Sequence, residues 1–366
     1  MSANVTAPQV YILILNWNGW RDTVECLESV FKIHYPAFRV IVCDNQSEDN
    51  SIGFLRMWAE GNFNLKISEA NQLKDYLLPP VPKPIPYMIC DDAEIDTNPA
   101  GDNGGARFII IRNRCNYGFA GGNNIGLRYI LARNDFDYVW LLNNDTVVAP
   151  DALTHLVERM AESQDTGICG STLLFYHNPK LIQALGGAKY HHWLGFTRQV
   201  AAGQIFPAAI AKETVESKIN YIIGASMFVS KRFLLDTGLM CEDYFLYFEE
   251  LDWAVRAKGR YSLGYAPKSV VFHKEGASIG CNRILKQRSL YGDYYLIINK
   301  IRFTRKFFPY ALPTIYLGIL AVLCKRMKDR MWKHVWLIIQ MLISIKVAKQ
   351  KITISKPPPE SENQLK

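Results

Sequence analysis

Apolar segments that end abruptly in polar residues constrain the fold of this chain more than any other feature. Val10–Leu15 is followed by Asn16, and Tyr138–Leu142 is followed by Asn-Asn-Asp at 143–145. Short continuous apolar runs are typical of strands buried on both faces of a parallel sheet, and open α/β sheets bind ligands at the carboxyl ends of their strands. The sequence therefore predicts a mostly parallel sheet with a ligand site at that edge.

Helical patterns alternate with these strands. After the first strand, apolar residues recur at helical spacing up to Phe31, and Asp22 and Glu25 are spaced as in a capping box. The next strand, Arg39–Cys43, ends in Asp44, which completes a βαβ unit. Further strands are expected at 108–112, 167–175, 221–229 and 270–274, and further helices around 125–131, at 151–162 and at 242–259.

Residues 66–105 interrupt this alternation. The segment combines proline, glycine and acidic residues, with a proline-rich run at 78–86. This composition is typical of long loops, so we expect an irregular insertion that holds at most one short strand, Tyr87–Cys90.

The strand ends carry candidate ligands. Asp145 follows two amide side chains, and magnesium or manganese prefers such hard oxygen ligands and keeps room for a diphosphate. Asn-Asn-Asp is also a common turn sequence, so this segment alone leaves a plain turn and a metal site open. Asp44 ends the second strand, where an acidic residue typically bonds a ribose or a base edge, with a solvated loop as the alternative.

A glycine-rich segment at 116–126 is a further candidate. Its glycines let backbone amides approach an anion at a helix N-terminus, and the paired Asn123 and Asn124 suggest specific hydrogen bonding. The spacing is not G-x-G-x-x-G, and a tight turn is the plain alternative.

An acidic cluster opens the late helix. Glu249, Glu250 and Asp252 lie among aromatic residues, and crowded carboxylates beside an apolar wall raise one another's pKa, which suits a general base. Acids in a first helical turn also simply complement the helix dipole. His273 ends the last strand and by itself reads as a structural histidine.

The composition is that of a globular protein in a reducing compartment. The chain of 366 residues is 49% hydrophobic and 21% charged. Its eight cysteines contain no C-x-x-C pair, which favours reduced thiols over a disulfide framework or a zinc site. The segment of residues 1–9 is short and polar, so no secretory signal peptide is expected.

Positive charge is concentrated near the C-terminus. Residues 282–351 hold 15 Lys and Arg against two acids, a net +13, which leaves 8 − 13 = −5 for residues 1–281 because the tail is neutral. The basic residues flank apolar runs rather than a polar groove, which favours an anionic membrane surface over nucleic acid. The 18-residue uncharged run Phe307–Cys324 contains two prolines, so we expect in-plane or shallow insertion, with a membrane span as the alternative. Residues 352–366 are expected to be disordered.

Six stretches of the sequence, taken together and in order, resemble a known family. The chain is similar to the inverting family-2 glycosyltransferases of GT-A fold, particularly the rhamnosyltransferase-like branch. The resemblance implies an α/β fold with a Rossmann-like, mostly parallel central sheet flanked by helices, and residues 66–105 fall outside it. The matching stretches are Ile14–Gly19, Val42–Ser47, Asn116–Gly126, Leu141–Thr146, Gly224–Phe228 and Phe245–Trp253.

The resemblance implies a catalytic base and a metal site. Glu250 occupies the position of the base, which takes a proton from an acceptor hydroxyl in a single inverting displacement. Asp145 matches the metal-binding Asp, Asn143 stands at an earlier position that is usually acidic, and His273 falls where relatives complete the site. The implied cofactor is a divalent cation, Mg²⁺ or Mn²⁺.

The resemblance also implies binding residues. The acceptor would be contacted or supported by Glu249, Asp252, Trp253 and Trp193. The donor nucleotide would be bound by Asn16, Asp44, Asn45, Ser47, Gly118, Gly121, Gly122, Asn123, Asn124 and Asn144.

The implied reaction moves a sugar from a nucleotide-diphosphate donor to a saccharide or polyprenyl-diphosphate-linked acceptor. L-rhamnose from dTDP-rhamnose, in cell-surface polysaccharide synthesis such as that of O-antigen, is the leading expectation, and a UDP-hexose donor is the alternative. A nucleotidyltransferase and an inactive membrane-bound scaffold are more distant alternatives. We expect a cytoplasmic protein held peripherally on the inner (plasma) membrane, without a nucleic-acid partner. A homodimer is compatible with this interpretation.

Overall fold

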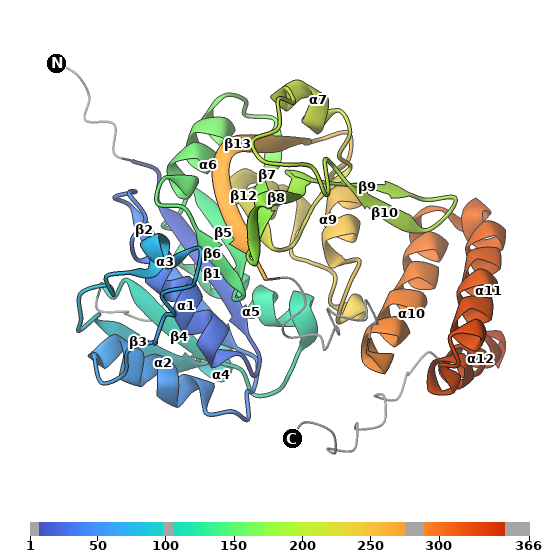
Figure 1. Cartoon of the computed structure of the whole chain (residues 1–366), viewed down its shortest axis with the longest axis horizontal. Coiled ribbons are helices and arrows are strands. Elements are labelled where there is room, and N and C mark those ends of the chain that lie inside the picture. The colour runs from blue at the N-terminus through green and yellow to red at the C-terminus, as the bar shows by residue number, and fades with distance from the viewer. Residues whose placement is uncertain (1–6, 98–104, 275–288, 348–366) are drawn as a thin grey trace. The chain divides into compact units, whose positions relative to one another are not determined.

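The computed structural model describes residues 7–97, 105–274 and 289–347, and the chain divides into two compact units. The first unit comprises Met1–His191 and Phe196–Ser278, and the second comprises His192–Gly195 and Ile279–Lys366. The first is α/β and the second is helical (Figure 1). The predicted boundary at 281 and the predicted disordered tail 352–366 lie outside the described residues.

A large sheet forms the centre of the first unit. Its strands are β1 (Val10–Asn16), β2 (Phe38–Asp44), β3 (Tyr87–Asp91), β4 (Phe108–Arg112), β5 (Tyr138–Asn143), β6 (Thr146–Val148), β7 (Thr166–Phe175), β8 (Asn178–Leu185), β12 (Ser226–Ser230) and β13 (Ser262–His273). The order is β3-β4-β2-β1-β5-β12-β7-β13-β6, and β8 pairs with β7. From β3 to β5 the neighbours are parallel, whereas β12 and β6 run antiparallel to their neighbours. The predicted mostly parallel sheet is confirmed.

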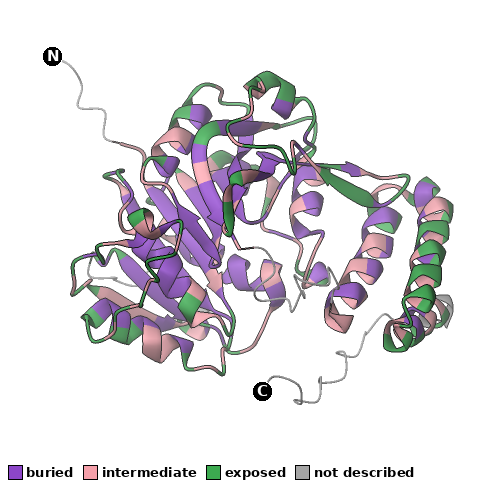
Figure 2. Ribbon diagram, viewed as in Figure 1, coloured by how far each residue is buried: buried purple, intermediate pink, exposed green. Residues whose placement is uncertain are grey.

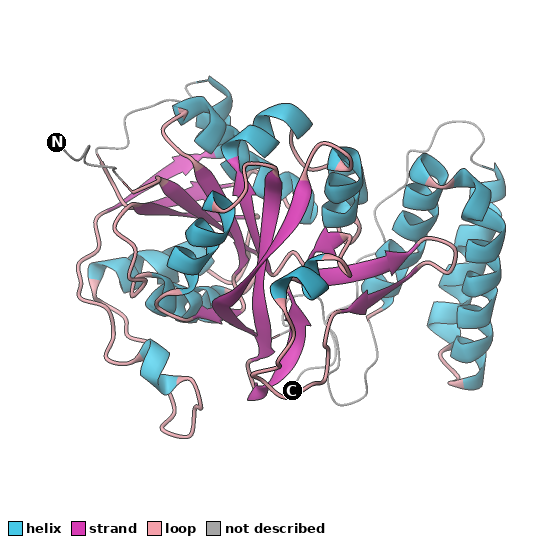
Figure 3. Cartoon of the chain, turned by 90° about the horizontal axis from the view of Figure 1, so that it is seen from above, coloured by secondary structure: helices cyan, strands magenta, loops and turns pink. Residues whose placement is uncertain are grey.

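The central strand β1 is buried on both faces, which explains its continuous apolar sequence. Tyr11 and Leu13 join one core cluster, and Ile12 and Ile14 join the other. Figures 2 and 3 show the buried strands with helices on both sides of the sheet. Helices α1 (Trp20–Val30), α2 (Ser51–Glu60) and α6 (Ala152–Ala161) contribute to the second cluster. Helices α3 (Lys74–Leu77), α4 (Asp92–Thr97), α5 (Gly118–Arg133), α7 (Lys212–Glu216), α8 (Lys231–Thr237) and α9 (Glu249–Ala257) contribute to the first.

Part of the predicted insertion at 66–105 belongs to the sheet. The short strand predicted at Tyr87–Cys90 is present as β3, which pairs in parallel with β4 at the sheet edge. Helices α3 and α4 lie on either side of it in the chain and were not predicted. An edge strand tolerates nearby prolines because only one side of its backbone needs a hydrogen-bond partner, so the proline-rich run does not exclude β3 from the sheet.

Two predicted helix starts are wrong. Helix α1 begins at Trp20 after Gly19, so Asp22 and Glu25 lie inside it and form no capping box. The helix predicted from Glu242 begins only at Glu249, after a 3₁₀ turn and a loop with positive φ at three aromatic residues. Such left-handed conformations at bulky residues depend on tertiary contacts, so the sequence pattern did not reveal them.

A small second sheet completes the α/β unit. Strands β9 (Gly187–His191), β10 (Phe196–Gln199) and β11 (Tyr221–Ile222) pair in the order β10-β9-β11. Strands β9 and β10 form an antiparallel hairpin. The strand predicted at 221–229 is divided into β11 and β12 around Gly224.

The second unit consists of three helices joined by short turns among the described residues. They are α10 (Leu290–Phe307), α11 (Leu312–Lys328) and α12 (Trp332–Val347), with a 3₁₀ turn at Pro309–Ala311. The uncharged run at 307–324 is therefore divided at Phe308 rather than forming one helix. Pro309–Lys328 is long and apolar enough to cross a membrane, with a mean hydropathy of 1.3. The core of this unit consists of Ile297, Ile301, Ile315, Ile319, Ile338 and Met341.

Candidate active site

Asn16 connects the polar ends of three neighbouring segments. Because β1 lies between β2 and β5, its last residue contacts groups from both sides. The Asn16 Nδ2 donates to Asp44 Oδ1 at 2.7 Å, and its Oδ1 accepts from the Thr23 hydroxyl at 2.7 Å and from Asn144 Nδ2 at 3.3 Å. The predicted edge of the sheet thus carries a connected polar network.

The predicted nucleotide-binding residues Asp44, Asn45 and Ser47 lie in this network. Asp44 is 1% exposed, and its second oxygen accepts from the backbone amide of Ser47 at 3.0 Å. Asn45 is also buried and donates to the Asn116 side chain at 2.9 Å. The Asp44 and Asn45 side chains therefore brace the ends of the strands in this structure.

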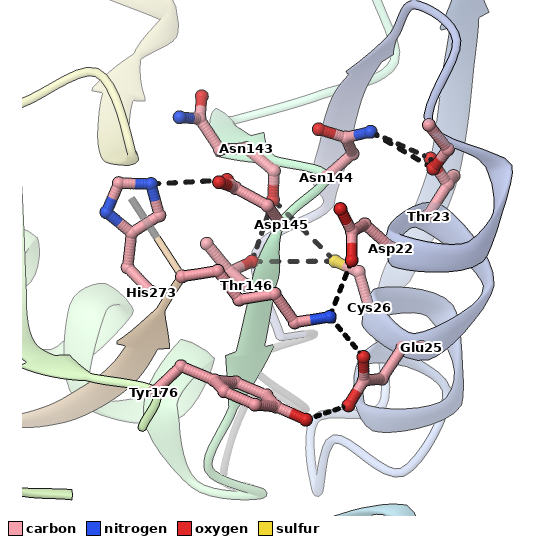
Figure 4. Close-up of polar contacts among 12 residues, drawn as sticks. Asp22, Thr23, Glu25, Cys26, Asn143, Asn144, Asp145, Thr146, Tyr176 and His273 are labelled. Carbon is pink, nitrogen blue, oxygen red and sulfur yellow. Dashed lines mark hydrogen bonds and ion pairs between the residues drawn. The ribbon is translucent and has the colours of Figure 1, made fainter. Parts of the chain in front are cut away.

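Asp145 lies in a tight turn that brings it to His273. The chain passes from β5 through Asn144 and Asp145 into β6, which pairs antiparallel with the end of β13 so that Thr146 lies opposite His273. The His273 Nε2 lies 3.2 Å from Asp145 Oδ1 (Figure 4). A plain turn and a metal site, the two alternatives that the sequence left open for this segment, are therefore compatible, because the turn itself directs the carboxylate toward a histidine.

A glutamine orients the His273 ring. The His273 Nδ1 lies 3.0 Å from the Gln183 Oε1 on β8, and both side chains are buried. An imidazole that donates from Nδ1 keeps its Nε2 directed at Asp145, which is the usual arrangement behind a metal-binding histidine. Gln183 was not found from the sequence, because a single glutamine in a strand carries no motif.

Asp145 and His273 are suited to a shared cation. Burial alone would raise the pKa of Asp145, but the adjacent His273 and the nearby Lys274 outweigh it, so the pKa lies below the ordinary value. Among the described residues, no group of three or more His, Cys, Asp or Glu could hold a metal ion. One carboxylate oxygen and one imidazole nitrogen fit Mg²⁺ or Mn²⁺ only if a substrate diphosphate supplies further oxygens.

A buried ion-pair cluster lies behind this pair. The Lys274 ammonium contacts Glu25 and lies 2.6 Å from Asp22, both on α1. The Tyr176 hydroxyl donates to the other oxygen of Glu25 (Figure 4). The Lys274 backbone amide donates to the Asp145 carbonyl at 2.9 Å, so the cluster also fixes the end of β13 that carries His273. Asp22 and Glu25, whose spacing resembled a capping box in the sequence, therefore anchor β13, the strand that ends in His273.

Glu249 and Glu250 begin helix α9. Glu249 is 1% exposed, and its Oε2 has no hydrogen-bond partner among the described residues. Burial and the adjacent Glu250 raise the pKa of Glu249 well above its ordinary value. Burial also raises the pKa of Glu250, while backbone hydrogen bonds, one of them from Gly224, oppose the rise. Two adjacent carboxyl groups with raised pKa values suit proton transfer near neutral pH.

Gly224 brings Glu250 to the same sheet edge as Asp145. A Cβ at Gly224 would lie 2.7 Å from Glu250 Oε1, so the missing side chain makes room for the carboxylate. The next residue, Ala225, accepts from the backbone amide of Asn143 at 3.1 Å. The candidate base therefore adjoins the end of β5, whose following turn carries Asp145.

The other predicted acceptor residues make contacts within their own units. Asp252 is buried and accepts from the Tyr244 hydroxyl at 2.9 Å and from Arg256 Nε at 2.7 Å. Trp253 is fully buried in the core and donates to the Gly238 carbonyl. Trp193 belongs to the helical unit, where its ring packs on that of Tyr310 at 5.0 Å.

The glycine-rich segment brings α5 close to its neighbours. Gly118 has φ +73°, and a Cβ there would lie 2.3 Å from the Phe245 carbonyl, which accepts from the Phe119 amide at 2.7 Å. Gly122 and Gly121 similarly face Leu15 and the Tyr117 side chain. A side chain at these positions would collide with neighbouring atoms, and this accounts for the glycines without the need for a bound ligand.

The amides predicted at the start of α5 have partners inside the protein. The Asn123 side chain donates to the Phe119 carbonyl at 2.9 Å. The Asn124 side chain donates to the Met240 carbonyl at 2.9 Å and to Glu242 at 2.8 Å, and it accepts from the Met240 amide at 3.1 Å. Asn124 therefore holds the chain that leads toward Glu249 against α5.

Comparisons with known proteins bear on the fold and the family. Residues 92–212 match the model of the family described as Glycosyl transferase family 2. No curated protein matches the chain. The structure is similar to that of the mannosyltransferase PcManGT from Pyrobaculum calidifontis in complex with GDP-Man and Mn²⁺, with a TM-score of 0.51 and 14% identity, covering 94% of this chain and 89% of that one. The fold is therefore the α/β GT-A fold, and the match supports a family-2 glycosyltransferase.

Two other solved structures are more distant. S. aureus TarS 1-349 is similar with a TM-score of 0.42 and 11% identity, covering 80% of this chain and 65% of that one. GalNAc-T7 with UDP, GalNAc and Mn²⁺ is similar with a TM-score of 0.48 and 13% identity, covering 81% of this chain and 51% of that one.

Proposed function

We propose that this protein is a glycosyltransferase that moves a sugar from a nucleotide-diphosphate donor to an acceptor hydroxyl in a single inverting displacement. The proposal rests on one observation above all. Glu250, a carboxyl group with a raised pKa, adjoins the strand end that leads into the Asp145–His273 pair. A base and a cation site at one sheet edge are what proton removal and diphosphate departure require.

In this mechanism Glu250 takes the proton of the acceptor hydroxyl, whose oxygen attacks the anomeric carbon from the face opposite the leaving group. The Gly224 amide holds the Glu250 carboxylate in place. Asp145 and His273 would hold the Mg²⁺ or Mn²⁺, which when bound neutralises charge on the departing diphosphate. Gln183 keeps the Nε2 of His273 directed toward that position.

The donor and the acceptor are narrower proposals. We retain dTDP-rhamnose as the donor on the resemblance to the rhamnosyltransferase-like branch, with a UDP-hexose as the alternative. The GDP-Man and Mn²⁺ in the similar mannosyltransferase accord with a nucleotide sugar and a divalent cation. The proposed acceptor is a saccharide or a polyprenyl-diphosphate-linked saccharide on the cytoplasmic side of the inner membrane, in cell-surface polysaccharide synthesis.

The substitution Glu250→Gln tests the reaction. It removes the base while preserving the shape of the side chain, so we expect sugar transfer to fall by roughly 10²–10⁴-fold with donor binding intact. A panel of nucleotide sugars, with and without Mn²⁺, would first identify the donor by thermal shift. NMR of the product would then show whether the anomeric configuration is inverted.

The matched control is Glu213→Gln, on the short helix α7, where the carboxylate side chain is 76% exposed. It should leave transfer unchanged. Near-normal turnover of the Glu250→Gln variant would refute the assignment of the base, and a retained anomeric configuration would refute the single displacement.

A further inference from the structure

Helices α11 and α12 each have a second apolar face that the protein leaves uncovered. One face of each helix packs in the core of the helical unit through Ile315 and Ile319 on α11 and Ile338 on α12. The other face remains accessible, and we call it the outer face. It comprises Leu317 (65% exposed), Leu320 (46%), Met327 (46%), Trp332 (62%), Trp336 (61%) and Ile343 (59%).

The outer face is continuous along each helix. Leu317 and Leu320 are three residues apart on α11, and Trp332 and Trp336 are four apart on α12, so each pair lies on one side of its helix. A helix with apolar residues on opposite sides needs cover on both. Six large exposed apolar side chains on these two helices exceed the scattered exposure that is usual for a soluble surface.

Exposed cations accompany these apolar residues. Lys325 and Lys328 lie in the last turn of α11, and Arg330 lies in the turn that follows. Lys333 lies in the first turn of α12, between the two tryptophans in the sequence. Tryptophan and leucine beside lysine and arginine are typical of helices that lie at a lipid interface, where apolar groups enter the acyl boundary and cations meet anionic headgroups. A second copy of this chain would place like charges against one another.

We propose that the outer face of α11 and α12 docks on an anionic phospholipid surface, with both helices in the membrane plane. The membrane is the partner that matches both the apolar side chains and the net charge of +13 over residues 282–351, counted as 15 Lys and Arg minus two acids. The inference does not depend on the proposed sugar transfer, because the residues that carry it are distinct from the candidate active site.

The packing of α11 favours this in-plane orientation over a membrane span. Its Arg326 forms an ion pair with Asp293 of α10 at 2.7 Å, and both side chains are largely buried. Helix α10 itself carries Lys300, Arg302 and Arg305, which do not suit a hydrocarbon environment. Moving α11 alone across a bilayer would separate the ion pair and uncover the shared core. Docking by the outer face preserves both.

Flotation of the full-length protein with vesicles tests the proposal. Vesicles of phosphatidylcholine with phosphatidylglycerol should carry the protein, and vesicles of phosphatidylcholine alone should carry much less. The double substitution Trp332→Ser and Trp336→Ser should lower the fraction bound to the anionic vesicles at least about tenfold, because both side chains enter the lipid boundary. The matched control is Ile205→Ser with Leu235→Ser, at residues that are 65% and 63% exposed in the α/β unit, and it should bind as the parent does.

A charge-reversal pair provides a second variant. Lys325→Glu with Lys328→Glu should weaken binding to anionic vesicles at least roughly fivefold per charge at low salt, since each cation near the surface contributes about that factor. Lys258→Glu with Lys268→Glu, at exposed positions of the α/β unit, should have a smaller effect.

Three results would overturn the proposal. Equal binding to neutral and anionic vesicles would remove the anionic surface as the partner. Retention of the protein in the vesicle pellet after alkaline carbonate extraction would indicate a span. If the protein is a dimer without lipid, and the Trp332→Ser and Trp336→Ser substitutions convert it to monomers, the outer face would bind a second copy of this chain. If the full-length protein binds anionic vesicles as expected but transfers no sugar, that result would count against the proposed function alone.

Discussion

Gln183 is the residue whose role the tertiary structure reveals most clearly. Its amide oxygen accepts from the Nδ1 side of His273, whose other nitrogen faces Asp145. Partners of this kind fix the tautomer and orientation of a metal-binding imidazole, and their loss typically costs 10- to 100-fold in metal affinity. In the proposed mechanism, Gln183 would act on the cation through His273.

We expect Gln183→Met to weaken Mn²⁺ binding by roughly 10- to 100-fold without unfolding the protein, because methionine matches the volume but cannot accept the hydrogen bond. Electron paramagnetic resonance of free Mn²⁺, in the presence of nucleotide diphosphate, measures this without turnover. Gln183→Glu, which keeps an acceptor oxygen, should retain most of the affinity, and Gln204→Met, at an exposed position, should change nothing. Unchanged Mn²⁺ affinity in Gln183→Met would remove Gln183 from the site.

Glu249 has a consequence for stability that can be measured against pH. Its folded-state pKa is raised above the ordinary value of 4.5, so the folded protein prefers the neutral acid. The contribution of Glu249 to stability is therefore fully present below its unfolded pKa and is lost as pH rises through its raised folded pKa. The substitution Glu249→Gln removes the ionisation and with it this loss.

The difference in melting temperature between the Glu249→Gln variant and the parent should accordingly change in favour of the variant as pH rises from about 4 to about 8. Thermal unfolding at several pH values, with Glu213→Gln as the control, provides the measurement. A difference that stays constant over this range would mean that the pKa of Glu249 is not raised in the folded protein.

At the scale of secondary-structure elements, the packing of α5 on the sheet depends on glycine. A Cβ at Gly126 would lie 2.3 Å from Leu13 Cδ1 and 3.0 Å from Cys43 Sγ, both in the buried strands β1 and β2. Inserting a methyl group into such a core typically costs 1–3 kcal/mol. The same strands end in Asn16 and Asp44, so this packing also supports the polar edge.

We expect Gly126→Ala to lower the free energy of unfolding of the α/β unit by about 1–3 kcal/mol, measured by urea denaturation. The matched control is Gly318→Ala in α11, where the nearest atom to an added Cβ is the Leu194 carbonyl at 3.9 Å. This second variant should gain about 0.5–1 kcal/mol, because alanine favours a helix over glycine. Effects of the same sign in both variants would contradict this packing argument.

The loop before α9 is the element that positions Glu250. Phe245, Tyr247 and Phe248 all have positive φ, a conformation that costs about 1–3 kcal/mol at each non-glycine residue. The Phe119 amide holds the Phe245 carbonyl, and the Phe248 ring packs against Tyr190 at 5.8 Å. The candidate base therefore lies in the first turn of a helix that follows strained backbone, and contacts from distant segments maintain this backbone.

At the scale of the whole molecule, the chain comprises two units with separate cores. The helical unit contains a buried ion pair between Asp293 and Arg326. Removing one partner leaves an uncompensated charge, which typically costs 3–5 kcal/mol.

We expect Asp293→Ala to shift one calorimetric transition of the full-length protein to lower temperature and to leave the other in place. Gly126→Ala should shift the opposite transition. This pattern follows if each core unfolds as its own cooperative unit. A single transition that both substitutions shift equally would mean that the two units unfold together.

The sequence was sufficient to predict the central parallel strands and the polar edge of the sheet. Buried parallel strands need apolar residues on both faces, and their polar residues can appear only where the strands end, so β1, β2 and β5 were identifiable from local composition. Asp145, Glu250 and His273 were likewise chosen from local motifs. Their roles in cation binding and proton transfer remain predictions.

Only the tertiary structure decided which of these side chains meet. The antiparallel pairing of β6 with β13 places His273 beside Asp145, and Gln183 on β8 completes the contact. The structure likewise shows that Asp22 and Glu25 form ion pairs with Lys274, which lies far from them in the sequence. Local patterns record helix and strand periodicity. Contacts between distant segments depend on sheet order and register, which a single sequence does not specify.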